Sequence, residues 1–156
     1  MGTEASLSEE MRLNVRVIAA RNLRAMDFNG FSDPYVKLQV GKQRFKTKVV
    51  KMNLNPEWDQ EFSFVVADVR EVLKFDVYDE DLIGIDDFLG QVKVPLEDLL
   101  AAENLSLGQR WYQLLPKSKS DKAVDCGNFL TSPVLLSWKF TSCLLSFSMW
   151  IQSLSF

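Results

Sequence analysis

Seven acidic residues lie in two short segments, 27–33 and 79–87, and each segment follows an apolar run. Neither segment contains Lys, Arg or His. If the fold brings the segments together, two carboxylates about 4 Å apart repel by roughly 4 kcal/mol at an effective dielectric constant of about 20. Such a cluster requires protonation or a hard cation, and oxygen ligands in this number favour calcium. The acidic residues are Asp27, Asp33, Asp79, Glu80, Asp81, Asp86 and Asp87.

The second acidic segment begins like an EF-hand loop, with Asp79, Asp81 and a glycine, Gly84, at the sixth position. However, the fifth position is Ile83 and the twelfth is Gly90, so two oxygen ligands of that loop are missing. The flanking segments also read as strands rather than helices. The EF-hand reading is therefore excluded.

The composition, with 47% hydrophobic and 25% charged residues among 156, predicts one globular domain. A net charge of −3 predicts no general affinity for nucleic acid. The absence of histidine removes the commonest general base and most zinc sites. Cys126 and Cys143 match no metal or redox spacing, which favours reduced thiols in a cytoplasmic protein. The leader, residues 1–11, is polar and acidic, so we expect no signal peptide.

The acidic segments must be positioned by strands, because apolar and polar residues alternate through most of the chain. Short strands at this spacing, with turn residues between them, indicate an all-β, antiparallel β-sandwich. Pro95 opens a short predicted helix, 96–102. The clearest predicted strands begin at Leu13 and cover 35–40, 43–50, 61–66, 72–78, 88–94 and 111–115.

The last 28 residues differ from the rest, because Lys139 is the only charged residue from Phe129 to the end. Pro133 cannot donate to a sheet ladder, so we expect residues 128–133 to form an edge or no strand. The domain is then expected over 12–128. Segment 129–156 either supplies a substitute last strand at 134–140, is a disordered tail, or anchors to a membrane through 140–156, which is slightly short for a bilayer span.

Five sequence motifs occur in a fixed order along the chain. They are Leu-Asn-Val-Arg-Val-Ile-Ala-Ala-Arg-Asn-Leu from Leu13, Gly-Phe-Ser-Asp-Pro-Tyr-Val from Gly30, Leu-Asn-Pro-Glu-Trp from Leu54, Val-Tyr-Asp-Glu-Asp from Val77 and Asp-Phe-Leu-Gly from Asp87. Together they resemble those of a C2 domain, the calcium- and lipid-binding module of protein kinase C and the synaptotagmins. The resemblance covers about 13–115, and the sequence is most similar to the first C2 domain of plant proteins that also carry a GRAM domain. It implies an eight-stranded sandwich with three calcium-binding loops at one end, in the topology that begins at the Leu13 strand.

The resemblance also implies a ligand set for two calcium ions. Main-chain carbonyls would be added at Phe28 and Glu80. Gly84 stands where some relatives use a serine for an extra ion. Isolated acidic residues are more often solvated turn formers, but all five acidic positions of the family are filled here. The implied carboxylate ligands are Asp27, Asp33, Asp79, Asp81 and Asp87.

The expected function is calcium-dependent binding to anionic phospholipid membranes, which include phosphatidylserine. Without calcium the loop end is negative and is repelled by anionic lipid; bound ions neutralise or reverse this field. Apolar loop residues either pack against the sandwich or insert among the headgroups. These residues are Phe28, Leu82, Ile83 and Ile85.

A basic face is predicted on one strand, where Lys42, Arg44, Lys46 and Lys48 share one parity. Lys37 on the paired strand resembles a member of the family's lysine-rich cluster. This face either binds phosphoinositides or is an ordinary solvated strand face.

We expect no enzyme, because the acidic segments carry no nucleophile and no histidine. The competing reading is a calcium-independent lipid-binding or protein-interaction module. The expected molecule is a monomer that is recruited peripherally from the cytoplasm to membranes.

Overall fold

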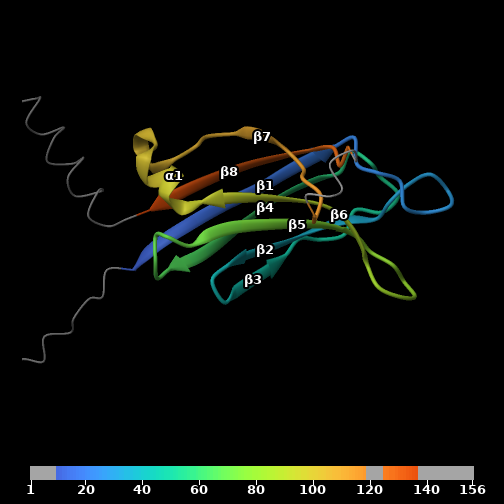
Figure 1. Ribbon diagram of the computed structural model, residues 1–156, viewed down its shortest axis with the longest axis horizontal. Coiled ribbons are helices and arrows are strands. Elements are labelled where there is room, and N and C mark those ends of the chain that lie inside the picture. The colour runs from blue at the N-terminus through green and yellow to red at the C-terminus, as the bar shows by residue number, and fades with distance from the viewer. Residues whose placement is uncertain (1–9, 119–124, 137–156) are drawn as a thin grey trace, which may run out of the picture.

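The protein forms two four-stranded antiparallel sheets, as Figure 1 shows for the computed structural model. The structure describes residues 10–118 and 125–136. The predicted all-β, eight-stranded sandwich is confirmed. The first sheet has the order β4-β1-β8-β7, and the second has the order β3-β2-β5-β6. Their bounds are β1 Met11–Arg21, β2 Pro34–Val40, β3 Gln43–Lys46, β4 Glu57–Val66, β5 Val72–Asp79, β6 Asp87–Pro95, β7 Arg110–Gln113 and β8 Asn128–Leu136.

The sheets pack face to face because alternate strand residues are apolar. Leu13, Val15 and Val17 of β1 have at most 1% of their surface exposed, whereas the intervening Asn14 and Arg16 are exposed. Burial of one large apolar side chain stabilises a fold by roughly 1.5–3 kcal/mol. The largest buried side chains are Trp58, Tyr35, Phe64, Phe75 and Phe129.

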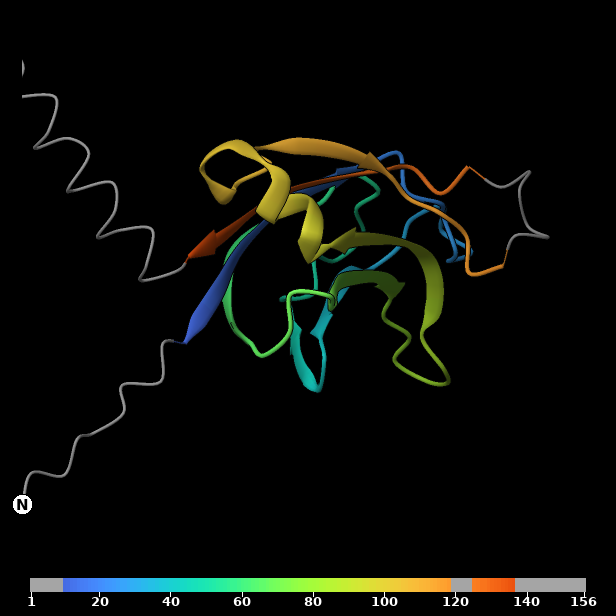
Figure 2. The same ribbon diagram turned by 60° about the vertical axis from the view of Figure 1, so that its left-hand side comes forward.

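A short helix connects the sheets at one end. Helix α1, Leu96–Ala101, follows Pro95 directly and buries Leu96 and Leu99, and a 3-10 turn, η1 Glu103–Leu105, leads on to β7. Figure 2 shows this connection passing from β6 in one layer to β7 in the other. In the described residues, no helix is long and apolar enough to cross a membrane.

Strand β8 differs from the expectation for Pro133. The strand runs from Asn128 to Leu136 and lies between β1 and β7, so Pro133 is inside a strand rather than before it. Strand β7 pairs with β8 only as far as Thr131, so at Pro133 the one continuous neighbour of β8 is β1. The proline is tolerated there because no continuous strand on the other side needs the amide hydrogen that proline lacks. Phe129 and Leu135 of β8 are buried in the core, so β8 completes the sandwich as its eighth strand.

Parts of the predicted C-terminal segment lie outside the described residues. These parts are 137–156, including Cys143 and the possible membrane anchor 140–156, and the same holds for most of the polar leader. The boundary drawn at 128 stays a prediction.

Strand β3 is shorter than the predicted 43–50 and ends at Lys46. Beyond it, the Thr47 hydroxyl accepts a bond from the amide of Val36 and donates one to the carbonyl of Lys48. The Thr47 side chain therefore replaces part of the regular ladder. The amide of Thr47 still donates to the carbonyl of Val36, and the amide of Val50 donates to the carbonyl of Pro34, the first residue of β2.

Candidate functional site

Sheet register brings three of the five predicted ligands to one edge. Asp33 immediately precedes β2, Asp79 is the last residue of β5, and Asp87 is the first residue of β6. Asp79 pairs with Pro34 on one side and with Asp87 on the other. Adjacent paired residues in a sheet lie about 4.5–5.5 Å apart, so the three backbones form a row at one end of the second sheet.

The first loop, residues 22–33, and the loop from β5 to β6 project from the same end of the molecule (Figure 1), and Asp27 of the first loop lines a pocket together with Asp81. The loop closes on itself, because the amide of Asp27 donates to the carbonyl of Phe31 and Gly30 adopts a φ of 81°. Arg24 fixes its base by donating to the carbonyl of Phe88 at 2.9 Å. The first loop is thereby tied to the beginning of β6.

Asp79 is the buried member of the cluster, with 1% of its surface exposed. Its Oδ1 accepts a bond of 2.5 Å from the amide of Asp33. Its Oδ2 is buried and has no hydrogen-bond partner in the described part of the chain. Burial, and then repulsion from Asp27 and Asp33, raises the pKa of Asp79.

Asp81 belongs to the same electrostatic cluster. Loss of solvent raises the pKa of its carboxyl, and the negative charges of Asp87, Asp27 and Asp86 raise it further. Asp27, Asp33 and Asp81 also line one open pocket between the loops, together with Phe28, Asn29, Glu80, Leu82 and Ile83. The third loop, residues 80–86, therefore faces the first across this pocket.

The side chains do not converge on a single point. Among the described residues, no group of three or more acidic, cysteine or histidine side chains stands close enough to hold a metal ion. The structure thus gathers the predicted ligands at one end of the sandwich and leaves their carboxylates apart, as expected for groups of like charge, which repel each other.

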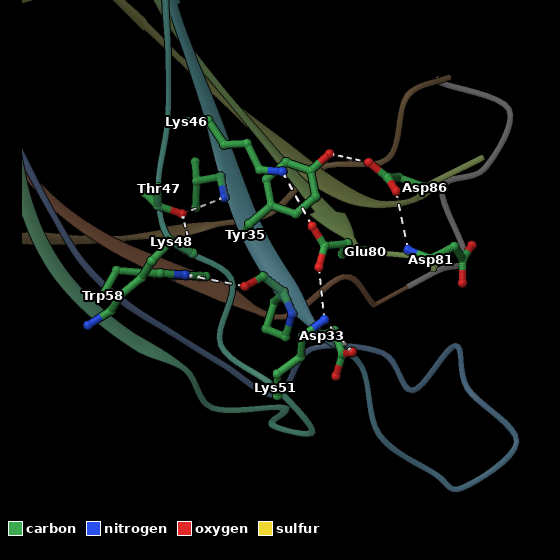
Figure 3. Close-up of polar contacts among 12 residues, drawn as sticks. Asp33, Tyr35, Lys46, Thr47, Lys48, Lys51, Trp58, Glu80, Asp81 and Asp86 are labelled. Atoms are coloured by element: carbon green, nitrogen blue, oxygen red, sulfur yellow. Dashed lines mark hydrogen bonds and ion pairs between the residues drawn. The ribbon is translucent and has the colours of Figure 1, made fainter. Parts of the chain in front are cut away.

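Asp86, next to Asp87, faces elsewhere. Its Oδ2 accepts a bond from the hydroxyl of Tyr35, and its Oδ1 accepts a bond of 3.2 Å from the amide of Asp81 (Figure 3). The bond from Tyr35 lowers the pKa of Asp86. Asp86 therefore closes the third loop rather than lining the pocket.

The sequence analysis missed Lys51, which lies in the second loop, residues 47–56. Its ammonium lies 2.8 Å from Oε2 of Glu80 and 3.1 Å from Oδ2 of Asp33, as Figure 3 shows. Hydrogen bonding to Glu80, and then to Asp33, raises the pKa of Lys51. No local pattern signals this contact, because Lys51 and Glu80 are 29 residues apart.

The four apolar loop residues do not pack against the sandwich. Phe28, Leu82, Ile83 and Ile85 have between 88% and 115% of their reference surface exposed. They project beside the acidic pocket, since Phe28, Leu82 and Ile83 line it.

The predicted basic face is brought together only in part. Lys37, Arg44 and Lys46 line one pocket on the second sheet with Tyr78, and the ammonium of Lys46 lies 3.8 Å from the ring centre of Tyr35. Lys42 and Lys48 do not line it. The shared parity fails for Lys48 because β3 ends at Lys46.

The sequence matches the family described as C2 domain over residues 11–114. This chain belongs to the C2 domain family. The resemblance predicted from the loop motifs is confirmed, and the sheets and loops described above are those of a C2 sandwich.

Curated relatives agree with this family. The chain is 58% identical over 120 residues to a C2 and GRAM domain-containing protein of Arabidopsis thaliana, which covers 77% of this chain and 12% of that protein. It is 42% identical over 95 residues to the Arabidopsis thaliana protein C2-DOMAIN ABA-RELATED 3, covering 61% of this chain and 56% of that protein. The chain thus spans only part of the length of these relatives.

Solved C2 structures share the fold. A C2 domain of plant extended synaptotagmin 1 superimposes with a TM-score of 0.69 at 27% identity, covering 83% of this chain and 97% of that one. The calcium-bound pair of C2 domains of extended synaptotagmin 2 superimposes with a TM-score of 0.68 at 28% identity, covering 83% of this chain and 46% of that one.

Proposed function

We propose that this C2 domain binds anionic phospholipid membranes through its acidic loop end in a calcium-dependent manner. The observation that carries the proposal is the buried Oδ2 of Asp79, which has no hydrogen-bond partner among the described residues. A buried carboxylate oxygen without a partner is costly. A cation in the adjoining pocket removes that cost.

The donor set fits calcium. It consists of carboxylates from the first and third loops, which are hard oxygen ligands, and includes no sulfur or imidazole. We propose as ligands Asp27, Asp33, Asp79, Asp81 and Asp87, with the main-chain carbonyls of Phe28 and Glu80, for two ions.

The charge of these residues determines when the domain can approach a membrane. Burial raises the pKa values of Asp79 and Asp81, and the neighbouring carboxylates raise them further. The same carboxylates make the loop end negative, so anionic headgroups repel it. Bound calcium supplies positive charge and coordination positions that lipid phosphate oxygens can occupy. The solved calcium-bound relative supports this cation for the family.

The exposed loop residues provide the apolar part of the interaction. Phe28, Leu82 and Ile83 line the acidic pocket, and Ile85 is exposed on the same loop as Leu82 and Ile83. These side chains can enter the headgroup zone once repulsion is removed. The same arrangement favours a monomer that is recruited from the cytoplasm to the membrane surface, and a binding module rather than an enzyme.

A second lipid contact is supported by the pocket on the second sheet. Lys37, Arg44 and Lys46 converge there beside Tyr78, and each cation near an anionic surface contributes about 1 kcal/mol. We propose phosphoinositide headgroups as the ligand of this pocket.

Vesicle sedimentation tests the function. The protein should sediment with phosphatidylserine vesicles in calcium and stay in solution with a chelator, and phosphoinositide vesicles should add chelator-resistant binding. D87N should lose the calcium-dependent fraction, whereas D86N should retain most of it, because both oxygens of Asp86 are already bonded, one to the hydroxyl of Tyr35 and the other to the amide of Asp81.

The control changes the same charge one residue away, so general electrostatics cannot explain a difference. Equal sedimentation in calcium and chelator would contradict the calcium dependence and favour a calcium-independent lipid-binding module. No sedimentation in either condition would favour a protein-interaction module.

A further inference from the structure

Lys51 contacts a proposed ligand directly. Its ammonium lies 3.1 Å from Oδ2 of Asp33. The other oxygen of Asp33, Oδ1, accepts a bond of 2.7 Å from the amide of Met52. The backbone of Met52 is in the left-handed region, with a φ of 49°. The second loop thus occupies both oxygens of Asp33.

Asp33 differs in this respect from the other proposed ligands. The Oδ2 of Asp79 is unpartnered, and no side-chain hydrogen bond or ion pair is found for Asp27, Asp81 or Asp87 in the described residues. For Asp33 to offer Oδ2 to a cation, Lys51 must withdraw. A calcium ion bound to Asp33 and the ammonium of Lys51 would also repel each other.

Glu80 provides a place to which Lys51 can withdraw. Its Oε2 lies 2.8 Å from the Lys51 ammonium, which is closer than Asp33 is. Glu80 contributes a main-chain carbonyl rather than its carboxylate to the proposed ligand set. Its Oε1 pairs with the ammonium of Lys46 at 3.6 Å (Figure 3), so Oε2 is the oxygen that can keep Lys51. Half of the Lys51 side chain is exposed, which leaves it room to move.

We propose that Lys51 is a built-in competitor for Asp33 that sets the calcium concentration at which the loops bind. This inference rests on the proposed function. Without calcium, Lys51 neutralises part of the acidic loop end and stabilises it. On calcium binding, Lys51 leaves Asp33 and stays with Glu80, so part of the binding free energy is used to break the contact with Asp33.

Calorimetric calcium titration of the full chain without lipid tests the proposal. K51M should bind calcium roughly two- to fivefold more tightly than the wild type, the upper part of the range expected for partly exposed ion pairs. K51R keeps the charge and should bind like the wild type. K74M removes a cation that pairs with Asp76 on β5 and should change the affinity less than twofold.

The melting temperature of K51M without calcium should change in the opposite direction to its calcium affinity. Without calcium, K51M should melt about 1–3 °C lower than the wild type because the acidic loops lose their counterion. In saturating calcium this difference should disappear or reverse. If Lys51 only stabilised the fold, K51M would lower the melting temperature both without calcium and in saturating calcium.

The outcomes separate this proposal from the proposed function. If the wild type binds calcium and K51M binds it equally or more weakly, Lys51 positions Asp33 or is irrelevant, and the competitor role is wrong. An equal gain in K74M would also overturn it, since any lost cation would then suffice. If neither protein binds calcium, the proposed function fails with it.

Discussion

Neighbouring acidic residues at the loop end have different surroundings and therefore different roles. Asp86 is held by the hydroxyl of Tyr35 and by the amide of Asp81, whereas Asp87 begins β6 beside Asp79. Among the acidic residues that the structure describes, Asp79 alone combines burial with an unpartnered oxygen. Each carboxylate is thus distinguished by its partners rather than by its residue type.

D79N should stabilise the domain in the absence of calcium while it removes the calcium response. The asparagine oxygen can still accept from the amide of Asp33, and the neutral amide nitrogen that replaces Oδ2 costs less to bury than the negative charge does. We expect a gain of about 1–2 kcal/mol, which is a rise in melting temperature of about 3–10 °C. Calorimetric melting of D79N and the wild type in the presence of a chelator measures this gain in stability.

The pH dependence gives an independent check on D79N. A carboxyl whose pKa is raised by folding binds its proton more tightly in the folded state, so stability is lost as pH rises from its ordinary value of 3.8 through the raised value. The loss of stability caused by the ionised Asp79 is complete at neutral pH. The advantage of D79N should therefore shrink as the pH falls toward 3.8, and a lower melting temperature at neutral pH would contradict the argument.

At the scale of elements, strand register fixes the site and the loops carry the variable chemistry. The ends of β2, β5 and β6 place Asp33, Asp79 and Asp87 in a row. The second loop adds Lys51 from the side. The third loop projects its apolar residues beyond the acids, and the rigid sheet below lets it do so without loss of core contacts.

I83A should weaken vesicle binding in calcium by about three- to tenfold, because part of a side chain worth roughly 1.5–3 kcal/mol when fully buried no longer enters the membrane. Calcium affinity in solution should not change, since Ile83 is 96% exposed. V72A is the control, because Val72 is an exposed apolar residue at the opposite end of β5. Equal losses in both variants would contradict insertion by the third loop.

At the scale of the whole molecule, the loops project from one end of a sandwich whose core is built mainly by the strands. The buried apolar side chains of β1, β5 and β8 belong to this core, and none of them lines the acidic pocket. Ligand binding at the loop end should therefore leave the fold intact and add to its stability.

Calcium should raise the melting temperature of the full chain, because a ligand that binds only the folded state stabilises it. At a free concentration of about one hundred times the dissociation constant, the gain is about 2.7 kcal/mol, or roughly 10 °C. Magnesium is the matched control and should produce a smaller rise, since it prefers a tighter octahedral site. An unchanged melting temperature in millimolar calcium would contradict the proposed function.

The sequence alone determined the sandwich and the place of its acidic loops. Alternating residues such as Leu13, Val15 and Val17 are a local signal, because neighbouring strand residues point to opposite faces. The loop motifs likewise reside in short contiguous segments, and they were sufficient to predict the C2 family and the candidate aspartates.

Only the tertiary structure decided the partners. It seated Pro133 inside β8, turned Asp86 toward Tyr35, left Asp79 with a free oxygen and placed Lys51 against Asp33. These contacts join residues that are 18 to 51 positions apart or depend on where a neighbouring strand ends. Local patterns carry no such information, because register between strands is set by the packing of the whole core.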